Sequence, residues 1–322
     1  MRSKSGTSPF GGSAVLFGGA NLKIVNDDGP HIHYCPLWEG APLTAMLNQY
    51  VTLPDEPAAV VMSGELADCF SEKKEGISFI VDAVKKAFHN ARFYGTDGQF
   101  HESAAARLAA ANWLASADFL REEYPEAVLL DIGSTTADII PLAWFESLKG
   151  LSDLIRLQKG YLIYTGLLRG NVATRLRSVL LDGVNTPVSA EYFAASADVH
   201  LVLGHIAPSQ YTSDTPDKKE KTQKASLRRL ARVVCADLDE IGENGAREIA
   251  EQFWEQQRDL ICSQVQRVAT ESRAHDIVVA GIGSYLFSKE LGGVDLADEI
   301  GSFADVLPAF SVRELAKRGG YS

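Results

Sequence analysis

The stretch DIGSTTADII (residues 131–140) decides the fold, because it places a glycine and three hydroxyls in a turn between two apolar segments. Gly133 permits a sharp turn and a close approach of the backbone to a ligand. The N–H groups and hydroxyls of Ser134, Thr135 and Thr136 can then point at phosphate oxygens. Alternatively, the stretch is an ordinary β-hairpin whose hydroxyls satisfy the backbone groups of the turn.

A second turn of this kind lies near the start of the chain, in GGANLK (18–23). Gly19 could approach a phosphate, Asn21 could donate a hydrogen bond, and Lys23 could supply a point charge. An ordinary Gly-Gly hairpin with an exposed lysine is the alternative. Because both turns lead into α/β segments, the repeat predicts a two-lobed α/β protein in which one hairpin loop from each lobe faces a shared central cleft.

A third segment with glycines, DIVVAGIGS (276–284), is typical of an apolar strand that runs into a helix. Gly281, Gly283 and Ser284 could present backbone N–H groups to a ligand. Many α/β strands end in glycine for packing alone, so this motif gains weight only beside the two hairpins. The three pieces in this order favour a phosphate site, with Asp131 placed to hold a divalent cation through water.

The remaining pattern predicts how the chain is divided. The apolar run DVHLVLG is typical of a strand, and Ser103 is a candidate N-cap for an Ala-rich helix. Two long helices are expected later in the chain, the second capped by Asn244. The expected ranges are a flexible tail at 1–12, a first lobe at 13–125, a second lobe at 126–322 with an inserted helical and loop region at about 165–240, a strand at 198–204, and helices at 103–122, 222–241 and 244–271.

Composition excludes several classes of function. The 322 residues carry a net charge of -11, which disfavours a nucleic-acid partner because binding would need a basic face. No apolar stretch reaches the roughly 18 residues of a membrane span. The four cysteines lack metal-site spacing and give no disulfide framework, which predicts a cytoplasmic protein.

The order of these motifs resembles the superfamily of actin, Hsp70 and the sugar and acetate kinases, which implies a ribonuclease H-like fold in each lobe. More specifically, the chain resembles the hydantoinase-A-related family of tetrahydromethanopterin-linked one-carbon transfer pathway proteins. Archaeal members of that family act in methanofuran biosynthesis and join a furanmethyl diphosphate to γ-glutamyltyramine with release of diphosphate. The segments that carry this resemblance span about residues 18–285: GGANLK, YCPLWEG, MSGELADCFSEKKEGI, DIGSTTADIIP, YTGLLRGNV, AEYFAASADVHLVLG, SDTPD and ASLRRLARVVCAD.

The resemblance implies an alkyl transferase with a diphosphate donor and a phenolic acceptor. A magnesium ion held by Asp131 would neutralise the leaving diphosphate, together with the two hairpin turns and Arg169 of TGLLRG. The phenol needs a proton acceptor, because its ordinary pKa is near 10. Asp138, Glu65 and His205 are the candidates, and the sequence does not rank them.

One departure from the superfamily pattern concerns the first hairpin, where Leu16 stands in place of an Asp two residues before the first glycine. This favours diphosphate chemistry over ATP hydrolysis. Two alternatives stay open: an ATP-dependent small-molecule kinase or hydantoinase-like enzyme, and a non-catalytic, ligand-sensing member of the fold. A homo-oligomer is a further expectation.

Overall fold

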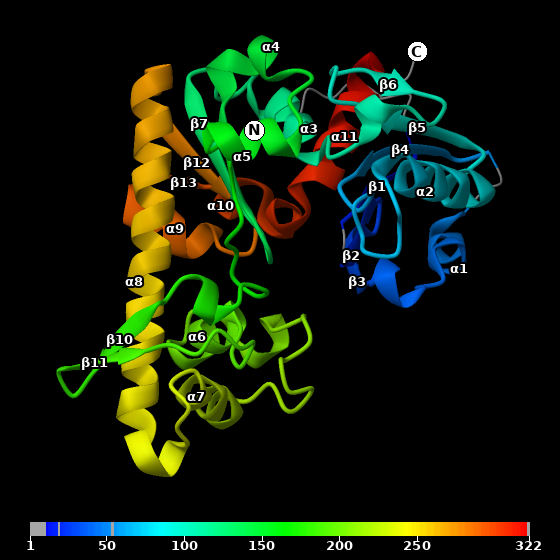
Figure 1. Cartoon of the computed structure of the whole chain (residues 1–322). Helices are drawn as coiled ribbons and strands as arrows, with labels where there is room; N and C mark the ends of the chain where they lie inside the picture. Colours follow the sequence, from blue (N-terminus) through cyan, green and yellow to red (C-terminus); the bar gives the residue numbers. More distant parts are fainter. Residues whose placement is uncertain (1–10, 19, 53–54, 321–322) are drawn as a thin grey trace.

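The first lobe is built on a sheet of six strands, in the order β3-β2-β1-β4-β5-β6 (Figure 1). The computed structural model describes residues 11–18, 20–52 and 55–320. Strands β1 to β3 form an antiparallel meander, and β4 and β5 continue the sheet parallel to β1. The strands are β1 Ser13–Phe17, β2 Asn21–Asn26, β3 Gly29–Tyr34, β4 Pro57–Met62, β5 Asn90–Tyr94 and β6 Phe100–His101.

The second lobe repeats this plan in a sheet of five strands, in the order β13-β12-β7-β8-β9. Strands β7 to β9 are again an antiparallel meander, and β12 and β13 again continue parallel to its first strand. The shared order confirms the predicted actin-like, sugar-kinase-like α/β architecture. The strands are β7 Ala127–Ile132, β8 Ala137–Pro141, β9 Leu162–Ile163, β12 Asp276–Ala280 and β13 Val294–Asp295.

The central strands of the first sheet are buried on both sides, because helices cover both faces of the sheet. Helices α1 (Leu43–Leu47) and α2 (Lys73–Ala87) share one apolar core with this sheet. Helices α3 (Asn112–Leu120) and α11 (Leu307–Leu315) belong to a second core that also contains the main strands of the second sheet. The two lobes are therefore joined by continuous apolar packing, and the predicted domain boundaries stay a prediction.

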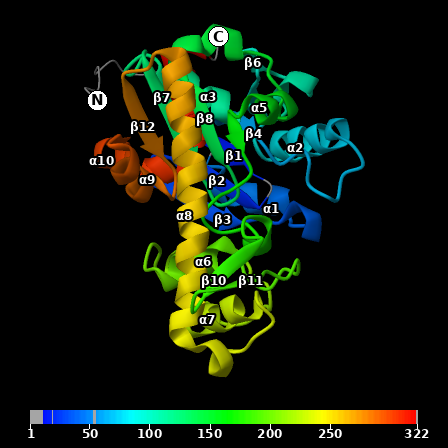
Figure 2. The ribbon, with the colours of Figure 1, turned by 60° about the vertical axis from the view of Figure 1, so that its left-hand side comes forward.

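One long helix, α8 (Leu238–Ser272), connects the second sheet to the helical region that contains α6 and α7. Figures 1 and 2 show this helix from two sides. One end of α8 packs on β7 and β8, and the other packs on α6 and α7. None of the helices within the described ranges has the length and apolar character that crossing a membrane requires. The other elements are α4 Phe145–Leu148, α5 Asp153–Lys159, β10 Ser178–Leu181, β11 Val184–Pro187, α6 Ser196–Val202, α7 Gln223–Arg232, α9 Ser284–Leu291 and α10 Ala297–Ile300.

The strand predicted at 198–204 is wrong, because this run forms helix α6. The carboxylate of Asp198 accepts the N–H of Ala195 at 2.9 Å, which favours a helix start. Every residue of α6 is buried, and its polar residues Ser196, Asp198 and His200 alternate with apolar ones, a pattern typical of a strand rather than of a helix.

The predicted helix boundaries are also shifted, and the helix predicted at 222–241 ends at Arg232 in α7. Ala110 has φ +47°, which separates a short 3₁₀ turn from α3, so the helix begins well after Ser103. Gly242, at φ 67°, interrupts the first turns of α8, and Asp237 rather than Asn244 accepts the N–H groups of the helix start. Of the predicted tail, residues 1–10 lie outside the described residues, and Gly12 accepts a hydrogen bond from Arg313 at 3.2 Å.

Candidate functional site

The two predicted hairpins occupy equivalent places in the two sheets but carry different charges. In the first, Leu16 of β1 stands directly opposite Lys23 of β2. In the second, Asp131 of β7 stands directly opposite Asp138 of β8. Directly opposed residues lie on the same face of a sheet, so the first hairpin presents one cation and the second presents two acids.

The turn of the second hairpin is held by a hydrogen bond of 2.9 Å from the N–H of Gly133 to the carbonyl of Thr136. The side chains of Ser134, Thr135 and Thr136 are partly exposed. Within the described chain, the N–H groups of these three residues have no hydrogen-bond acceptor. Three adjacent free donors beside three hydroxyls are suited to an anion such as phosphate.

The segment TGLLRG packs directly on this turn. A Cβ atom at Gly166 would lie 2.5 Å from the backbone nitrogen of Thr135, so only glycine fits there. The N–H groups of Leu168 and Arg169 donate to the carbonyl of Ser134 at 3.0 and 2.9 Å. This segment therefore satisfies the carbonyl groups of Gly133 and Ser134, whereas the N–H groups of residues 134–136 have no acceptor in the described chain.

The first hairpin supplies a cation that reaches toward the second lobe. The ammonium of Lys23 donates to the backbone oxygen of Asp305 at 2.6 Å, in the 3₁₀ helix η7 (Gly301–Val306). Burial lowers the pKa of Lys23, and the carboxylates of Asp131 and Asp305 oppose that effect. Asn21 lies partly exposed at the turn, and Gly19 lies outside the described residues.

Leu16 is buried in the core shared by the two lobes, with 5% of its surface exposed. A carboxylate at this position would be desolvated against apolar neighbours. The first hairpin therefore has no acid beside its cation.

The third predicted motif packs against the second hairpin. Gly281 has φ +82°, and a Cβ atom there would lie 2.5 Å from the carbonyl oxygen of Ile132 and 2.6 Å from the Asp131 carboxyl. Gly283 packs on Ile132 in the same way, and Ser284 is buried at the start of α9. The glycines thus allow close approach to β7, and their contact with a phosphate stays a prediction.

Asp131 is the one predicted acid that is both partly exposed and without a hydrogen bond to a described residue. Burial raises its pKa to about 7, with Asp138 adding to the rise and Lys23 opposing it. The described residues contain no group of three or more metal-ligating side chains. A single carboxylate beside a turn with free N–H donors fits Mg²⁺, which takes most of its ligands from water and substrate phosphates, and both the metal and the phosphate stay predictions.

Asp138 is held by a buried ion pair with Arg156, whose guanidinium also lies 4.2 Å from the ring centroid of Trp113. Arg156 binds Asp153 as well, at 2.9 Å. Burial raises the pKa of Asp138, and Arg156 opposes the rise. This ion pair ties β8 to α5, so Asp138 has a structural partner that the sequence did not indicate.

Glu65 follows β4 and is almost completely buried, with 1% of its surface exposed. Its Oε2 atom has no hydrogen-bond partner in the described structure. Burial raises the pKa of Glu65, and Asp153 raises it further. A buried carboxyl oxygen without a partner costs free energy and is typical of a functional group.

His205 lies apart from these acids, in the helical region. Its Nδ1 atom is 3.0 Å from Nδ1 of His200, and the second nitrogen of His200 is 2.9 Å from the Gln257 side chain. Gln257 donates in turn to Thr165 and to the carbonyl of Gly166. The two histidines are therefore linked through Gln257 to the segment that packs on the turn of the second hairpin, and a role of His205 as the base stays a prediction.

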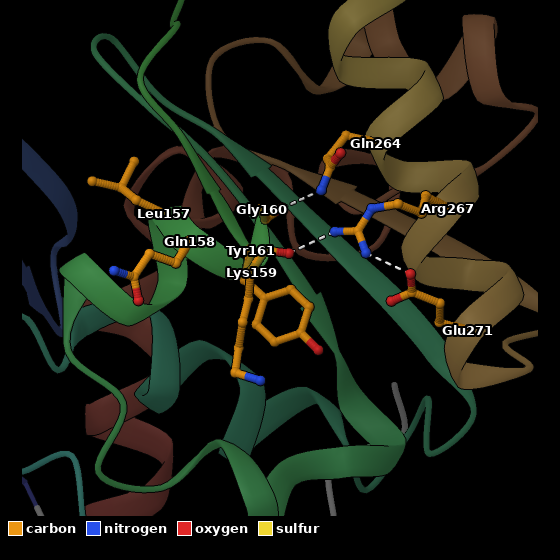
Figure 3. Close-up of a pocket in the computed structure, with 8 residues that line it drawn as sticks. All are labelled: Leu157, Gln158, Lys159, Gly160, Tyr161, Gln264, Arg267 and Glu271. Carbon is orange, nitrogen blue, oxygen red and sulfur yellow. Dashed lines mark hydrogen bonds and ion pairs between the residues drawn. The ribbon is translucent and has the colours of Figure 1, made fainter.

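Two surface hollows lie away from the hairpins. One, of about 470 Å³, is lined by residues of α5, of the turn after it and of α8, including Lys159 and Tyr161 (Figure 3). Gln264 donates to the carbonyl of Gly160 across it at 2.9 Å, and Arg267 donates to that of Lys159 at 2.5 Å. The other, of about 380 Å³, lies between α1 and α2. Neither hollow contains a predicted site residue.

Comparison with known proteins places the chain in a family. The model for hydantoinase/oxoprolinase proteins matches residues 56–309. The chain belongs to this family. The match includes the second hairpin and the glycines after β12, whereas the first hairpin precedes it.

Two curated relatives of this hydantoinase/oxoprolinase chain share one name, (4-{4-[2-(gamma-L-glutamylamino)ethyl]phenoxymethyl}furan-2-yl)methanamine synthase. The protein from Methanocaldococcus jannaschii is 34% identical over 320 residues, which cover 94% of this chain and 97% of the relative. The protein from Methanococcus vannielii is 32% identical over 200 residues, which cover 59% of this chain and 90% of the relative.

Among solved structures, the chain is similar to a nucleotide-free acetone carboxylase, with 13% identity and a TM-score of 0.47. The similarity covers 91% of this chain and 51% of the carboxylase chain, so this chain spans about half the length of that protein. It is also similar to a ROK family glucokinase from Streptomyces griseus, with 12% identity over 96% of this chain and 99% of the kinase and a TM-score of 0.44.

Proposed function

We propose that this protein is an aryl-ether-forming transferase of methanofuran-type cofactor biosynthesis, in tetrahydromethanopterin-linked one-carbon metabolism. The observation that carries the proposal is the 34% identity, over 94% of the chain, with the M. jannaschii synthase. The name of that relative describes a product in which a phenol oxygen is joined to a furan-bearing methylene. The substrates proposed here are a furanmethyl diphosphate that carries an aminomethyl group, and γ-glutamyltyramine or a related phenol.

In the proposed step, the phenol oxygen forms a bond to the furan methylene carbon. The bond from that carbon to the diphosphate oxygen breaks, and diphosphate leaves with the electron pair. Charge therefore grows on the leaving group, and fixed donors aimed at it lower the barrier. The free N–H groups of Ser134, Thr135 and Thr136 and the nearby ammonium of Lys23 support this role.

A magnesium ion at Asp131 would add its two positive charges to that of Lys23 beside the departing diphosphate. The phenol proton must pass to a base. We assign the role of this base to Glu65, because one of its carboxyl oxygens lacks a partner, whereas Asp138 is paired with Arg156. The raised pKa of Glu65 suits a group that accepts a proton.

The alternative, an ATP-dependent kinase or hydantoinase-like enzyme, has less support from the first hairpin. Leu16 leaves that hairpin without the acid that the superfamily pattern places there. We propose a cytoplasmic reaction, because both substrates are small polar molecules and all four cysteines are free thiols.

The test is an assay of purified protein with both synthetic substrates and magnesium, in which mass spectrometry follows the ether and released diphosphate. We expect Thr135→Ala to lower kcat by about 10-fold or more, since it removes a hydroxyl from the phosphate turn. A partly exposed threonine of β11, whose hydroxyl donates to the carbonyl of Val184 at 3.2 Å, serves as a control in Thr186→Ala. Ether formation that Thr135→Ala and Asp131→Ala both leave unchanged would overturn the assignment of the site.

A further inference from the structure

Aromatic and charged side chains from both parts of the chain meet beside the phosphate turn. Tyr34 and Trp38 come from the first lobe, and Arg169, Tyr192 and Asp214 come from the segments around the helical region. The guanidinium of Arg169 lies 5.1 Å from the ring centroid of Trp38. The hydroxyl of Tyr34 donates to the carboxylate of Asp214 at 3.4 Å. These five residues are called the aromatic cluster below.

The aromatic cluster is joined to the phosphate turn through the backbone. Arg169 donates its N–H to the carbonyl of Ser134 at 2.9 Å, so its side chain begins at the turn itself. Its guanidinium then reaches Trp38 of the first lobe. A ligand whose phosphates occupy the turn can therefore extend along Arg169 into the cluster.

The rings of this cluster face outward, although they are large and apolar. Tyr34 is 41% exposed and Tyr192 is 47% exposed. Burial raises the pKa of Tyr34, and Asp214 adds to the rise while Arg169 opposes it. The same two charged groups act on the pKa of Tyr192. Burial and Asp198 contribute most to the raised pKa of Tyr192, and Glu39 also acts on the pKa of Tyr34, but Arg169 and Asp214 lie within electrostatic reach of both phenols.

Asp214 is an exposed carboxylate that forms no ion pair with any residue in the described ranges. From the turn outward, the site therefore offers free N–H donors, then the cation of Arg169, then aromatic rings beside an unpaired carboxylate. A ligand that complements this order is anionic at one end, flat and apolar in the middle, and cationic at the other end.

We propose that the aromatic cluster binds the aminomethyl-furan portion of the diphosphate donor. The furan ring would lie against Trp38 and Tyr34, and the ammonium would bind Asp214 and the faces of the tyrosine rings. Arg169 repels the ammonium and so fixes the direction in which the donor lies. This inference rests on the proposed function, because the furan and methanamine groups of the donor are those in the name of the two related synthases.

The experiment compares two donors: the aminomethyl-furanmethyl diphosphate and an analogue with methyl in place of aminomethyl. We expect Asp214→Asn to lower kcat/KM for the aminomethyl donor by roughly 10- to 100-fold, the effect of losing one charge-assisted hydrogen bond. The methyl donor should change by less than about 3-fold. Asp182→Asn, an exposed carboxylate in the turn between β10 and β11, is the matched control and should leave both donors unchanged.

A binding measurement separates this inference from the proposed function. Calorimetry without acceptor compares the aminomethyl donor with inorganic diphosphate. We expect Asp214→Asn to weaken the donor about 10-fold or more and to leave inorganic diphosphate unchanged. If the wild type forms no ether but this difference remains, the proposed function fails and the aminomethyl-furan site stands. Equal effects on both donors, or no effect on donor binding, would overturn the site.

Discussion

Replacing Asp131 by Asn should change how stability depends on pH, because the carboxyl is forced into a poorly solvated place among other acids. Its pKa rises from 3.8 to about 7, mainly through burial. The folded protein then keeps this proton between about pH 4 and 7, whereas the unfolded chain has lost it. The free energy of unfolding therefore falls as pH rises through that window. The shift corresponds to about 4 kcal/mol at full effect, and water at this partly buried group reduces it to about 2 to 4 kcal/mol.

The assay is urea unfolding of wild type and Asp131→Asn without metal, at pH 4.5, 6 and 8. Asn cannot ionise, so the variant should match the wild type at pH 4.5 and exceed it by about 2 kcal/mol or more at pH 8. Asp182→Asn, in the exposed turn after β10, controls for the loss of a surface charge. A stability difference for Asp131→Asn that stays constant over this range would refute the argument that the acid is strained in the fold.

Three further substitutions test how residues around the site contribute to the stability of the fold. Gly281→Ala should lower the free energy of unfolding by about 3 kcal/mol, because φ +82° is strained for Ala and the Cβ would meet a carbonyl oxygen at 2.5 Å. The control is Gly150→Ala, at a similar φ but with no neighbouring atoms, which should cost only about 1 kcal/mol. Urea unfolding measures both. Gln257→Leu leaves the carbonyl of Gly166 without its donor, and we expect a loss of about 1 to 3 kcal/mol together with a lower kcat. Leu16→Asp should lose about 3 kcal/mol or more in the same unfolding assay, since it puts a charge in the shared core; a neutral result would mean that Lys23, directly opposite, or water compensates the new carboxylate.

The hairpins and their glycines could be predicted from sequence because turn chemistry is local. Gly133 with its run of hydroxyls, and the glycines after β12, are signals within a few residues, and the repeated hairpin predicts the repeated sheet. The sheets confirm that repeat. Helix α6 was missed because all of its residues are buried, so polar and apolar residues alternate along it as in a strand and the sequence shows no helical period.

Contacts between distant residues could not be predicted in this way. Arg156 looks like any surface arginine of a short helix, yet it binds Asp138 in the core. Lys23 meets the backbone of Asp305, which lies 282 residues away. Neither pairing leaves a periodic or spacing signal, because the first depends on how α5 packs on β8 and the second on how the two lobes meet.

The most direct test of the account uses an acceptor phenol labelled with ¹⁸O. Wild-type protein, magnesium and the furanmethyl diphosphate are added, and the products are analysed by mass spectrometry. If the phenol oxygen attacks the methylene carbon, the ether keeps the full label and the diphosphate carries none. Label in a phosphorylated phenol, or turnover that requires ATP and yields no ether, would contradict the proposal that the hairpins hold the diphosphate of an alkyl donor.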